Sequence, residues 1–135
     1  MAGILADNDV QGQFRELVAL LGSEKRRKSW ESLQLPIETF ETLGLARNAS
    51  DLVIWQTCQR HEIVLFTANR NDEGPESLEA AIRSYNQPSS LPVITLGNPK
   101  RFSYDRRYIH RVAERLLDIL HNLDNYRGAG RLYVP

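Results

Sequence analysis

Acidic and amide side chains follow two short apolar segments of the sequence. The apolar residues 4–6 (ILA) run into 7–9 (DND), and 63–66 (IVLF) run into 67–72 (TANRND). Carboxylate and amide oxygens are the ligands that Mg²⁺ and Mn²⁺ prefer, and these ions keep several waters, so one to three carboxylates suffice. Carboxylates crowded together repel one another, and a cation offsets that cost. The spacing therefore predicts a divalent-cation site.

Four aspartates are the candidate ligands at this stage: Asp7, Asp9, Asp51 and Asp72. Carboxylates from two strand ends and one helix start can converge without unusual geometry, because ligands bind at the carboxyl edge of open α/β sheets. A second interpretation stays open. Asp9 and Asp51 also suit the first turns of helices, where the dipole favours acids, while the other two would lie in solvated turns.

The stretch 62–73 is the element that must position these residues. Its continuous apolar run, bounded by turn formers, is typical of a parallel strand buried on both faces. Strands and helices alternate along the chain, which predicts a three-layer α/β/α sandwich with a central, mainly parallel sheet of four to five strands, in one domain over 1–135. The predicted strands are 3–7, 37–40, 63–66 and 92–96, and the predicted helices are 11–21, 51–60, 75–85 and 104–126.

Composition narrows the class of protein further. With 135 residues and 41% hydrophobic residues, the chain is long enough for one core, and no apolar run reaches the roughly 18 to 20 residues that a membrane helix needs. The first ten residues have no basic flank or long apolar region, so we expect no signal peptide and a cytoplasmic protein. One cysteine, Cys58, excludes an internal disulfide and a cysteine-based zinc site. A net charge of +0 argues against a surface that is basic throughout, although not against a local basic patch.

Three short motifs in order resemble the PIN-like nuclease domains. They are LADNDV after the first strand, Ser50-Asp51 before a middle helix, and FTANRND after the apolar strand. The closest likeness is to the small stand-alone branch related to VapC-type toxin ribonucleases. Members of that branch typically have an Asp with acidic or amide neighbours after strand one, a Ser-Asp pair, and a strand ending T-x-D-x-D.

The resemblance implies a Mg²⁺- or Mn²⁺-dependent phosphodiesterase that acts on RNA. It makes Asp7 the principal metal ligand and Asp51 a second one, with Asn8 or Asp9 beside them and Thr67 orienting the third acidic position. The two aspartates of the family motif fall on Asn69 and Asn71 here. An amide oxygen can bind a cation but adds no charge, so Asp72 or Glu73 would have to supply it. The expected catalytic residues are Asp7, Asp51 and Asp72, and the expected metal ligands are Asp7, Asp9, Asp51, Asn69 and Asp72.

Substrate contacts are expected from polar and basic residues. Thr67, Arg70 and Asn71 lie in the motif after the central strand, and the Asn-Arg-Asn run could instead bind a ligand by hydrogen bonding. Two basic clusters, 25–28 and 100–115, could contact phosphates, with Tyr104, Tyr108 and Phe102 stacking on unpaired bases. The first cluster equally suits the negative end of a helix, and the second a solvated helix face. Lys25, Arg26, Arg107 and Arg111 are the basic residues expected to bind substrate.

Two function hypotheses follow from these residues. The first is a PIN-like ribonuclease that would be the toxin half of a toxin–antitoxin pair, with an antitoxin-like protein partner. The second is a PIN-like binding module without catalysis that acts through a protein or RNA partner. A phosphoacceptor domain is excluded, since no aspartate ends the central strand and no lysine ends the last one. The apolar tail 131–135 would pack on its own domain or on a twofold mate, and the resemblance favours a dimer.

Overall fold

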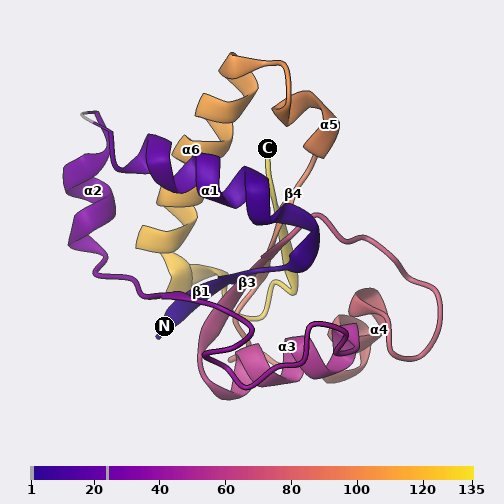
Figure 1. The fold of residues 1–135 in the computed structure, drawn as a ribbon. Helices are drawn as coiled ribbons and strands as arrows, with labels where there is room; N and C mark the ends of the chain where they lie inside the picture. The colour runs from indigo at the N-terminus through magenta and orange to yellow at the C-terminus, as the bar shows by residue number, and fades with distance from the viewer. Residues whose placement is uncertain (1, 24) are drawn as a thin grey trace.

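The computed structural model describes residues 2–23 and 25–135, and its centre is a five-stranded sheet. All four strand pairs are parallel, and the order across the sheet is β2-β1-β3-β4-β5 (Figure 1). This confirms the predicted α/β class with a parallel sheet of up to five strands. The strands are β1 (Gly3–Ala6), β2 (Ile37–Glu38), β3 (Ile63–Thr67), β4 (Val93–Leu96) and β5 (Arg131–Val134).

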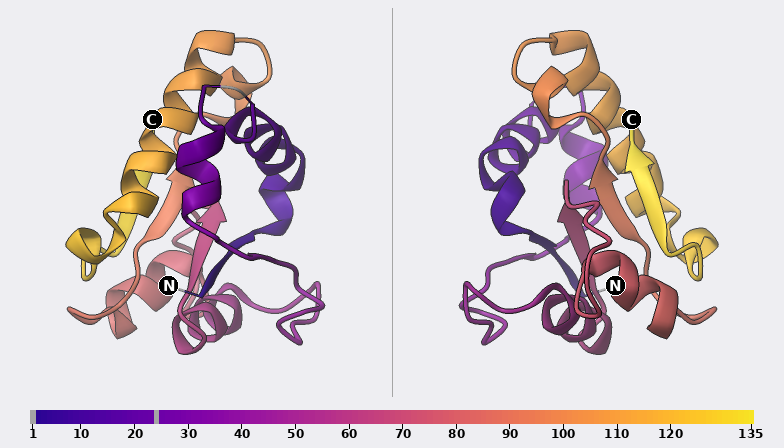
Figure 2. Two further views of the ribbon diagram at one scale, coloured as in Figure 1. Left: turned by 90° about the vertical axis from the view of Figure 1, so that its left-hand side faces the viewer. Right: turned by 90° about the vertical axis from the view of Figure 1, so that its right-hand side faces the viewer.

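Helices cover both faces of the sheet and complete the three layers (Figures 1 and 2). The first face packs against α1 (Gln11–Leu21) and α6 (Arg106–His121), with the short α2 (Arg27–Ser32) and α5 (Pro99–Phe102) beside them. The opposite face packs against α3 (Asp51–Arg60) and α4 (Leu78–Tyr85). Two 3-10 turns, η1 (Asn8–Val10) and η2 (Leu123–Tyr126), follow β1 and α6.

The apolar run of β3 explains why both faces are covered. Successive side chains of a strand point to opposite faces. Val64 and Phe66 therefore enter the core under α1 and α6, and Ile63 and Leu65 enter the core under α3 and α4. All four are at most 3% exposed, so the strand contributes equally to two hydrophobic cores. The continuous run in the sequence is thus the signature of a central position in the sheet.

Several predicted helix boundaries are confirmed, and others are wrong. The helix α3 spans the predicted residues, and the Ser50 hydroxyl caps it by accepting a hydrogen bond from the Val53 amide. The helix α4 was predicted to begin at Pro75, but it begins at Leu78, because Ser77 accepts from the Ala80 amide and is the actual cap. On α3 the side chains of Ile54, Trp55 and Cys58 are buried, whereas Val53 is 44% exposed.

The last predicted helix is divided, and part of the first basic cluster is helical. In place of one helix over 104–126, the chain forms α6 and the 3-10 turn η2, while α5 precedes this range. The Asp105 carboxylate accepts from the Tyr108 amide and so starts α6 anew. The second half of the basic cluster 25–28 is helical, since α2 begins at Arg27.

The apolar tail packs on its own domain as the edge strand β5. Gly128 and Gly130 have φ angles of 88° and 82°, a region that side-chain-bearing residues rarely adopt, and they turn the chain back along β4. Val134 is fully buried there, and the Tyr108 hydroxyl donates to the Pro135 carbonyl at 3.0 Å. Within the described residues, no helix has the length and apolar character needed to span a membrane.

Candidate functional site

The acidic residues meet at the carboxyl ends of β1 and β3, in the middle of the sheet. The chain leaves β1 towards the β2 edge and leaves β3 towards the β4 and β5 edge, so the order of strands reverses between these two neighbours. In open α/β sheets, such a switch point is where ligands bind, since the two connections diverge and leave a crevice. Asp7 directly follows β1, and Thr67 is the last residue of β3. The fold therefore places both residues at the expected binding position.

Thr67 connects the two aspartates that follow β1. Its buried hydroxyl donates to Asp7 Oδ2 at 2.9 Å and lies 3.4 Å from Asp9 Oδ1. The other Asp7 oxygen accepts from the Asn8 amide at 2.8 Å, and Asp9 Oδ2 accepts from the Ala68 amide at 3.2 Å. Each carboxylate is thus fixed by one backbone donor. Towards the position where the resemblance expects the third acid, the Thr67 hydroxyl instead accepts from the Asn69 backbone amide at 3.0 Å.

The environment of these carboxylates disfavours negative charge. Burial raises the pKa of Asp7, and the nearby Asp51 raises it further, against the lowering effect of the Asn8 and Thr67 hydrogen bonds. Partial desolvation also raises the pKa of Asp9, with the charge of Asp7 adding to the effect. Among the described residues, no basic side chain forms an ion pair with Asp7, Asp9 or Asp51. Asp7, Asp9 and Asp51 form the acidic cluster of this site, and its carboxylates accept hydrogen bonds but have no positively charged partner in the described part of the chain.

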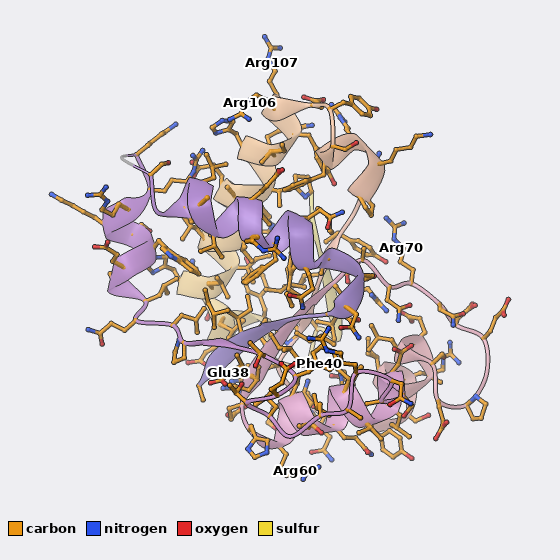
Figure 3. All side chains as sticks on the ribbon, in the orientation of Figure 1. Glu38, Phe40, Arg60, Arg70, Arg106 and Arg107 are labelled. Carbon is orange, nitrogen blue, oxygen red and sulfur yellow. The ribbon has the colours of Figure 1, made fainter. Side chains whose placement is uncertain are left out.

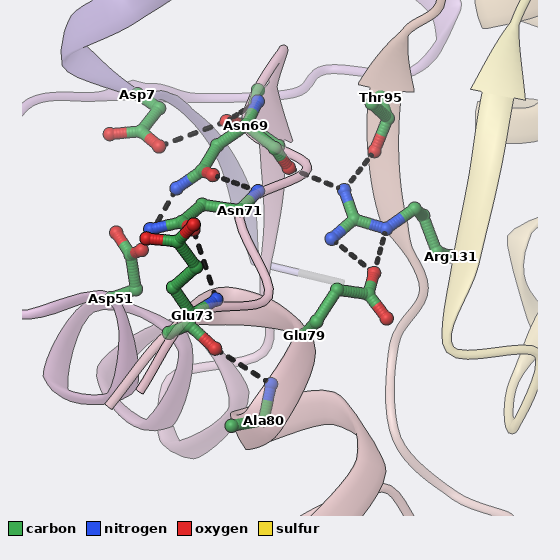
Figure 4. A network of polar contacts seen from close by, with 11 residues as sticks. Asp7, Asp51, Asn69, Asn71, Glu73, Glu79, Ala80, Thr95 and Arg131 are labelled. Atoms are coloured by element: carbon green, nitrogen blue, oxygen red, sulfur yellow. Dashed lines mark hydrogen bonds and ion pairs between the residues drawn. The ribbon is translucent and has the colours of Figure 1, made fainter. Parts of the chain in front are cut away.

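Asn69 occupies the position of the first expected family aspartate after β3 (Figure 4). Its amide Nδ2 donates to Asp51 Oδ2 at 2.9 Å, and its Oδ1 accepts from the Asn71 backbone amide at 2.8 Å. Asn71 repeats this pattern, since its Oδ1 accepts from the Glu73 amide at 3.0 Å. Two successive side-chain-to-backbone turns therefore shape the loop, and Asn69 presents a donor rather than an acceptor to the acidic cluster.

Arg131 holds this loop from the far edge of the sheet, and sequence reasoning missed it. Its guanidinium is 7% exposed and donates to the Asn69 carbonyl at 2.7 Å, to Thr95 Oγ1 at 2.8 Å and to Glu79 Oε1 at 2.7 Å (Figure 4). It therefore joins the loop after β3 to β4 and α4. The signal available in the sequence was a single arginine in an otherwise apolar segment, RLYV.

Two further residues of the predicted site lie near the same edge but outside the cluster. Asp72 is exposed and makes no hydrogen bond or ion pair with any described residue. Arg70 is also exposed, and its guanidinium donates to the Gly97 carbonyl and lies 5.2 Å from the centre of the Tyr133 ring. Figure 3 shows Arg70 extending from the loop into solvent.

The basic residues predicted to bind substrate are placed elsewhere. Lys25, Arg26 and Arg111 line one groove of about 650 Å³ against α6, which none of the acidic cluster lines. Arg26 is buried there, and its Nε lies 2.8 Å from Glu114 Oε1, so its charge already has a partner. Arg107 is exposed at the start of α6, at the top of Figure 3. The structure does not bring these residues to the acidic cluster.

The donor set can be compared with the needs of a cation. In residues 2–23 and 25–135, no three His, Cys, Asp or Glu side chains are arranged to hold a metal ion together. Mg²⁺ usually takes only one or two carboxylates and completes its shell with water and substrate phosphate. One or two carboxylates from Asp7, Asp9 and Asp51 would meet that requirement, without all three binding the same ion. Comparisons with protein-family models, with curated proteins and with solved structures found no match for this chain.

Proposed function

We propose that this chain is a Mg²⁺- or Mn²⁺-dependent ribonuclease of the PIN-like type that hydrolyses RNA phosphodiester bonds. The observation that supports it best is the cluster of Asp7, Asp9 and Asp51 at the switch point between β1 and β3, without a basic partner among the described residues. Asp7 is buried, so holding its carboxylate in the charged form beside two further carboxylates is costly, and a bound cation would offset that cost. The hydrogen bonds to the cluster supply no positive charge, whereas the proposed cation would.

In this proposal each residue of the cluster has a distinct role. Asp7 is the principal ligand, because the Asn8 amide and the Thr67 hydroxyl fix its carboxylate. Asp51 is the second ligand, and Asp9 is held beside them on the Ala68 amide. A bound Mg²⁺ or Mn²⁺ would supply charge for the phosphate oxygens and lower the pKa of a water. Asp72 would have to turn inwards to add a further carboxylate.

The partners of the proposed enzyme follow from the surface and from the resemblance. Arg70 stacks on Tyr133, which is 48% exposed, and together they offer a cation and an aromatic ring to a single strand of RNA at the edge of the site. The resemblance to toxin ribonucleases supports an antitoxin-like protein partner and a homodimer as further parts of the proposal. Each of these two parts can fail without affecting the metal site.

A second candidate function is a PIN-like binding module without catalysis. The observation that favours it is the amide of Asn69, whose Nδ2 donates to Asp51 at 2.9 Å and so satisfies that carboxylate without a cation. A ligand oxygen of Asn69 would become available only if the amide turned over and gave up the Asn71 hydrogen bond. In this form of the proposal, the 69–71 loop binds an RNA or protein partner by hydrogen bonding.

Calorimetric titration with Mn²⁺ distinguishes the two candidates. Wild-type protein, Asp7→Asn and the control Asp118→Asn, an exposed carboxylate on α6, are titrated and then tested for cleavage of single-stranded RNA. We expect binding by the wild type and the control, loss of binding in Asp7→Asn, and Mn²⁺-dependent cleavage that follows binding. No heat of binding at about 1 mM Mn²⁺ would rule out the nuclease and leave the binding module.

A further inference from the structure

A polar pocket of about 350 Å³ adjoins the acidic cluster on its β2 side. Asn8, which directly follows Asp7, lines it, and the pocket lies over the carboxyl ends of β1 and β2. One wall is α1, which contributes Gln11 and Arg15, one turn apart on the same helix face. The other wall is the segment 39–47. Its lining residues are Thr39, Phe40, Glu41 and Arg47.

The second wall is held in place by specific contacts. The Asn8 side-chain amide donates to the Arg47 carbonyl at 2.9 Å and so ties the segment to the end of β1. Thr39 and Thr42 exchange hydrogen bonds between backbone amides and hydroxyls at 2.9 and 3.1 Å, and Phe40 is 4% exposed in the core. The pocket is therefore formed before any ligand arrives, as ligand pockets usually are.

Charge in this pocket has the opposite sign to that of the acidic cluster. Arg15 is exposed, and its side chain forms no ion pair or hydrogen bond with any residue in 2–23 or 25–135. Arg47 is 81% exposed at its side chain and lies 3.1 Å from Glu41. The pocket is lined by two arginines and one glutamate, so it has one net positive charge beside the three aspartates of the acidic cluster. A positive pocket beside a proposed metal site suits an RNA backbone, in which one phosphate is cut at the metal and the neighbouring phosphate is bound in the pocket.

We propose that this pocket binds the phosphate of the nucleotide next to the scissile bond of single-stranded RNA, with Arg15 as its main contact; this rests on the nuclease function proposed above. The guanidinium of Arg15 has all its donors free for phosphate oxygens. The side-chain NH₂ of Gln11 donates to the Ala6 carbonyl at 2.7 Å. The side-chain oxygen of Gln11 is then left to accept from a ribose hydroxyl or a base. The pocket is small, so it admits a single nucleotide and not a duplex.

Salt-dependent RNA binding without metal tests this assignment independently of catalysis. Wild type, Arg15→Gln, Arg15→Lys and the control Arg83→Gln are compared in EDTA, with a fluorescein-labelled single-stranded RNA of about ten nucleotides, by anisotropy over a range of NaCl. Arg83 is a matched control, because it is exposed on α4 against the opposite face of the sheet. A parallel series in Mn²⁺ measures KM and kcat for cleavage.

We expect Arg15→Gln to weaken binding about tenfold and to reduce the slope of log K against log[NaCl] by about 0.7, the value for one phosphate contact in a single strand. Arg15→Lys should keep the slope, Arg83→Gln should change neither quantity, and in Mn²⁺ the KM of Arg15→Gln should rise more than kcat falls. An unchanged slope and affinity in Arg15→Gln would overturn the pocket assignment even if the protein cleaves RNA. A reduced slope without cleavage in any metal would support the pocket and refute the nuclease.

Discussion

Replacing Asn69 by Asp tests whether this position decides the charge balance of the cluster. In the structure, the Asn69 amide donates to Asp51 at 2.9 Å. The variant Asn69→Asp removes that donor and places a second carboxylate about 3 Å from the first, an arrangement worth about 5 kcal/mol of repulsion at an effective dielectric constant of about 20. Neither side chain is fully buried, so solvent screening and proton uptake reduce the cost. We expect a loss of about 2 kcal/mol in the free energy of unfolding in EDTA.

A cation should reverse this loss, because it would offset the repulsion between the carboxylates at positions 51 and 69. Binding to the native state at a cation concentration of about 100 Kd contributes about 2.7 kcal/mol. Urea unfolding of Asn69→Asp should therefore show low stability in EDTA and stability close to that of the wild type in Mn²⁺. Manganese affinity measured by calorimetry should also exceed that of the wild type.

Asn71→Asp is the matched control for this experiment. The Asn71 side chain uses only its Oδ1, which accepts from the Glu73 amide, and an aspartate keeps that acceptor. Among the described residues, the Asn71 side chain forms no hydrogen bond with a carboxylate, so we expect a change within about 0.5 kcal/mol. If Asn69→Asp were as stable as Asn71→Asp in EDTA, the account of charge crowding around Asp51 would be refuted.

Three further predictions concern the surroundings of the cluster. Burial raises the pKa of Asp7 above its ordinary value of 3.8, so the native state binds more protons than the unfolded chain as the pH falls from neutral towards that value. The free energy of unfolding in EDTA should therefore rise as the pH falls over this window. Urea unfolding at pH 7 and pH 5 should show that Asp7→Asn is more stable than wild type at pH 7 and that its stability rises less. Arg131→Met should cost about 3 kcal/mol in thermal unfolding, because it removes the buried partner of Glu79 and the donor to Asn69; a cost below about 1 kcal/mol would contradict a supporting role. Burial raises the pKa of the Cys58 thiol to about 12, so iodoacetamide at pH 8 should label it only after unfolding, and rapid labelling of the native protein would contradict the packing of α3.

The fold was largely predictable because its strongest signals are local. The residues IVLF of β3 indicated a strand buried on both faces, and Ser50 indicated the start of α3 from one residue type at one position. The wrongly predicted start of α4 arose where two neighbouring residues could both begin the helix. Pro75 and Ser77 both suit a helix start, and the hydroxyl of Ser77 decides between them.

The candidate site was predictable only in part. Asp7 and Thr67 could be placed because strand ends converge at one edge of a parallel sheet, and the structure has them 2.9 Å apart. Which end of the Asn69 amide faces Asp51 depends on the Asn71 backbone amide, and no pattern in the sequence encodes that choice. Arg131 could not be foreseen, because its contact with the loop spans 62 positions and exists only once β5 is paired with β4.

The dependence of the loop on Arg131 sets the order in which the site can be completed during folding. Residues 7, 51 and 69 leave the ribosome early, and their strands and helix can begin to associate as soon as they emerge. The loop after β3 acquires its anchor only when the last strand docks, since the guanidinium of Arg131 binds the Asn69 carbonyl from that strand. Contacts between distant positions close late, because the chain must first lose the entropy of the intervening loop. A partly synthesised chain thus contains every acidic residue of the cluster and lacks the support that fixes the loop beside them.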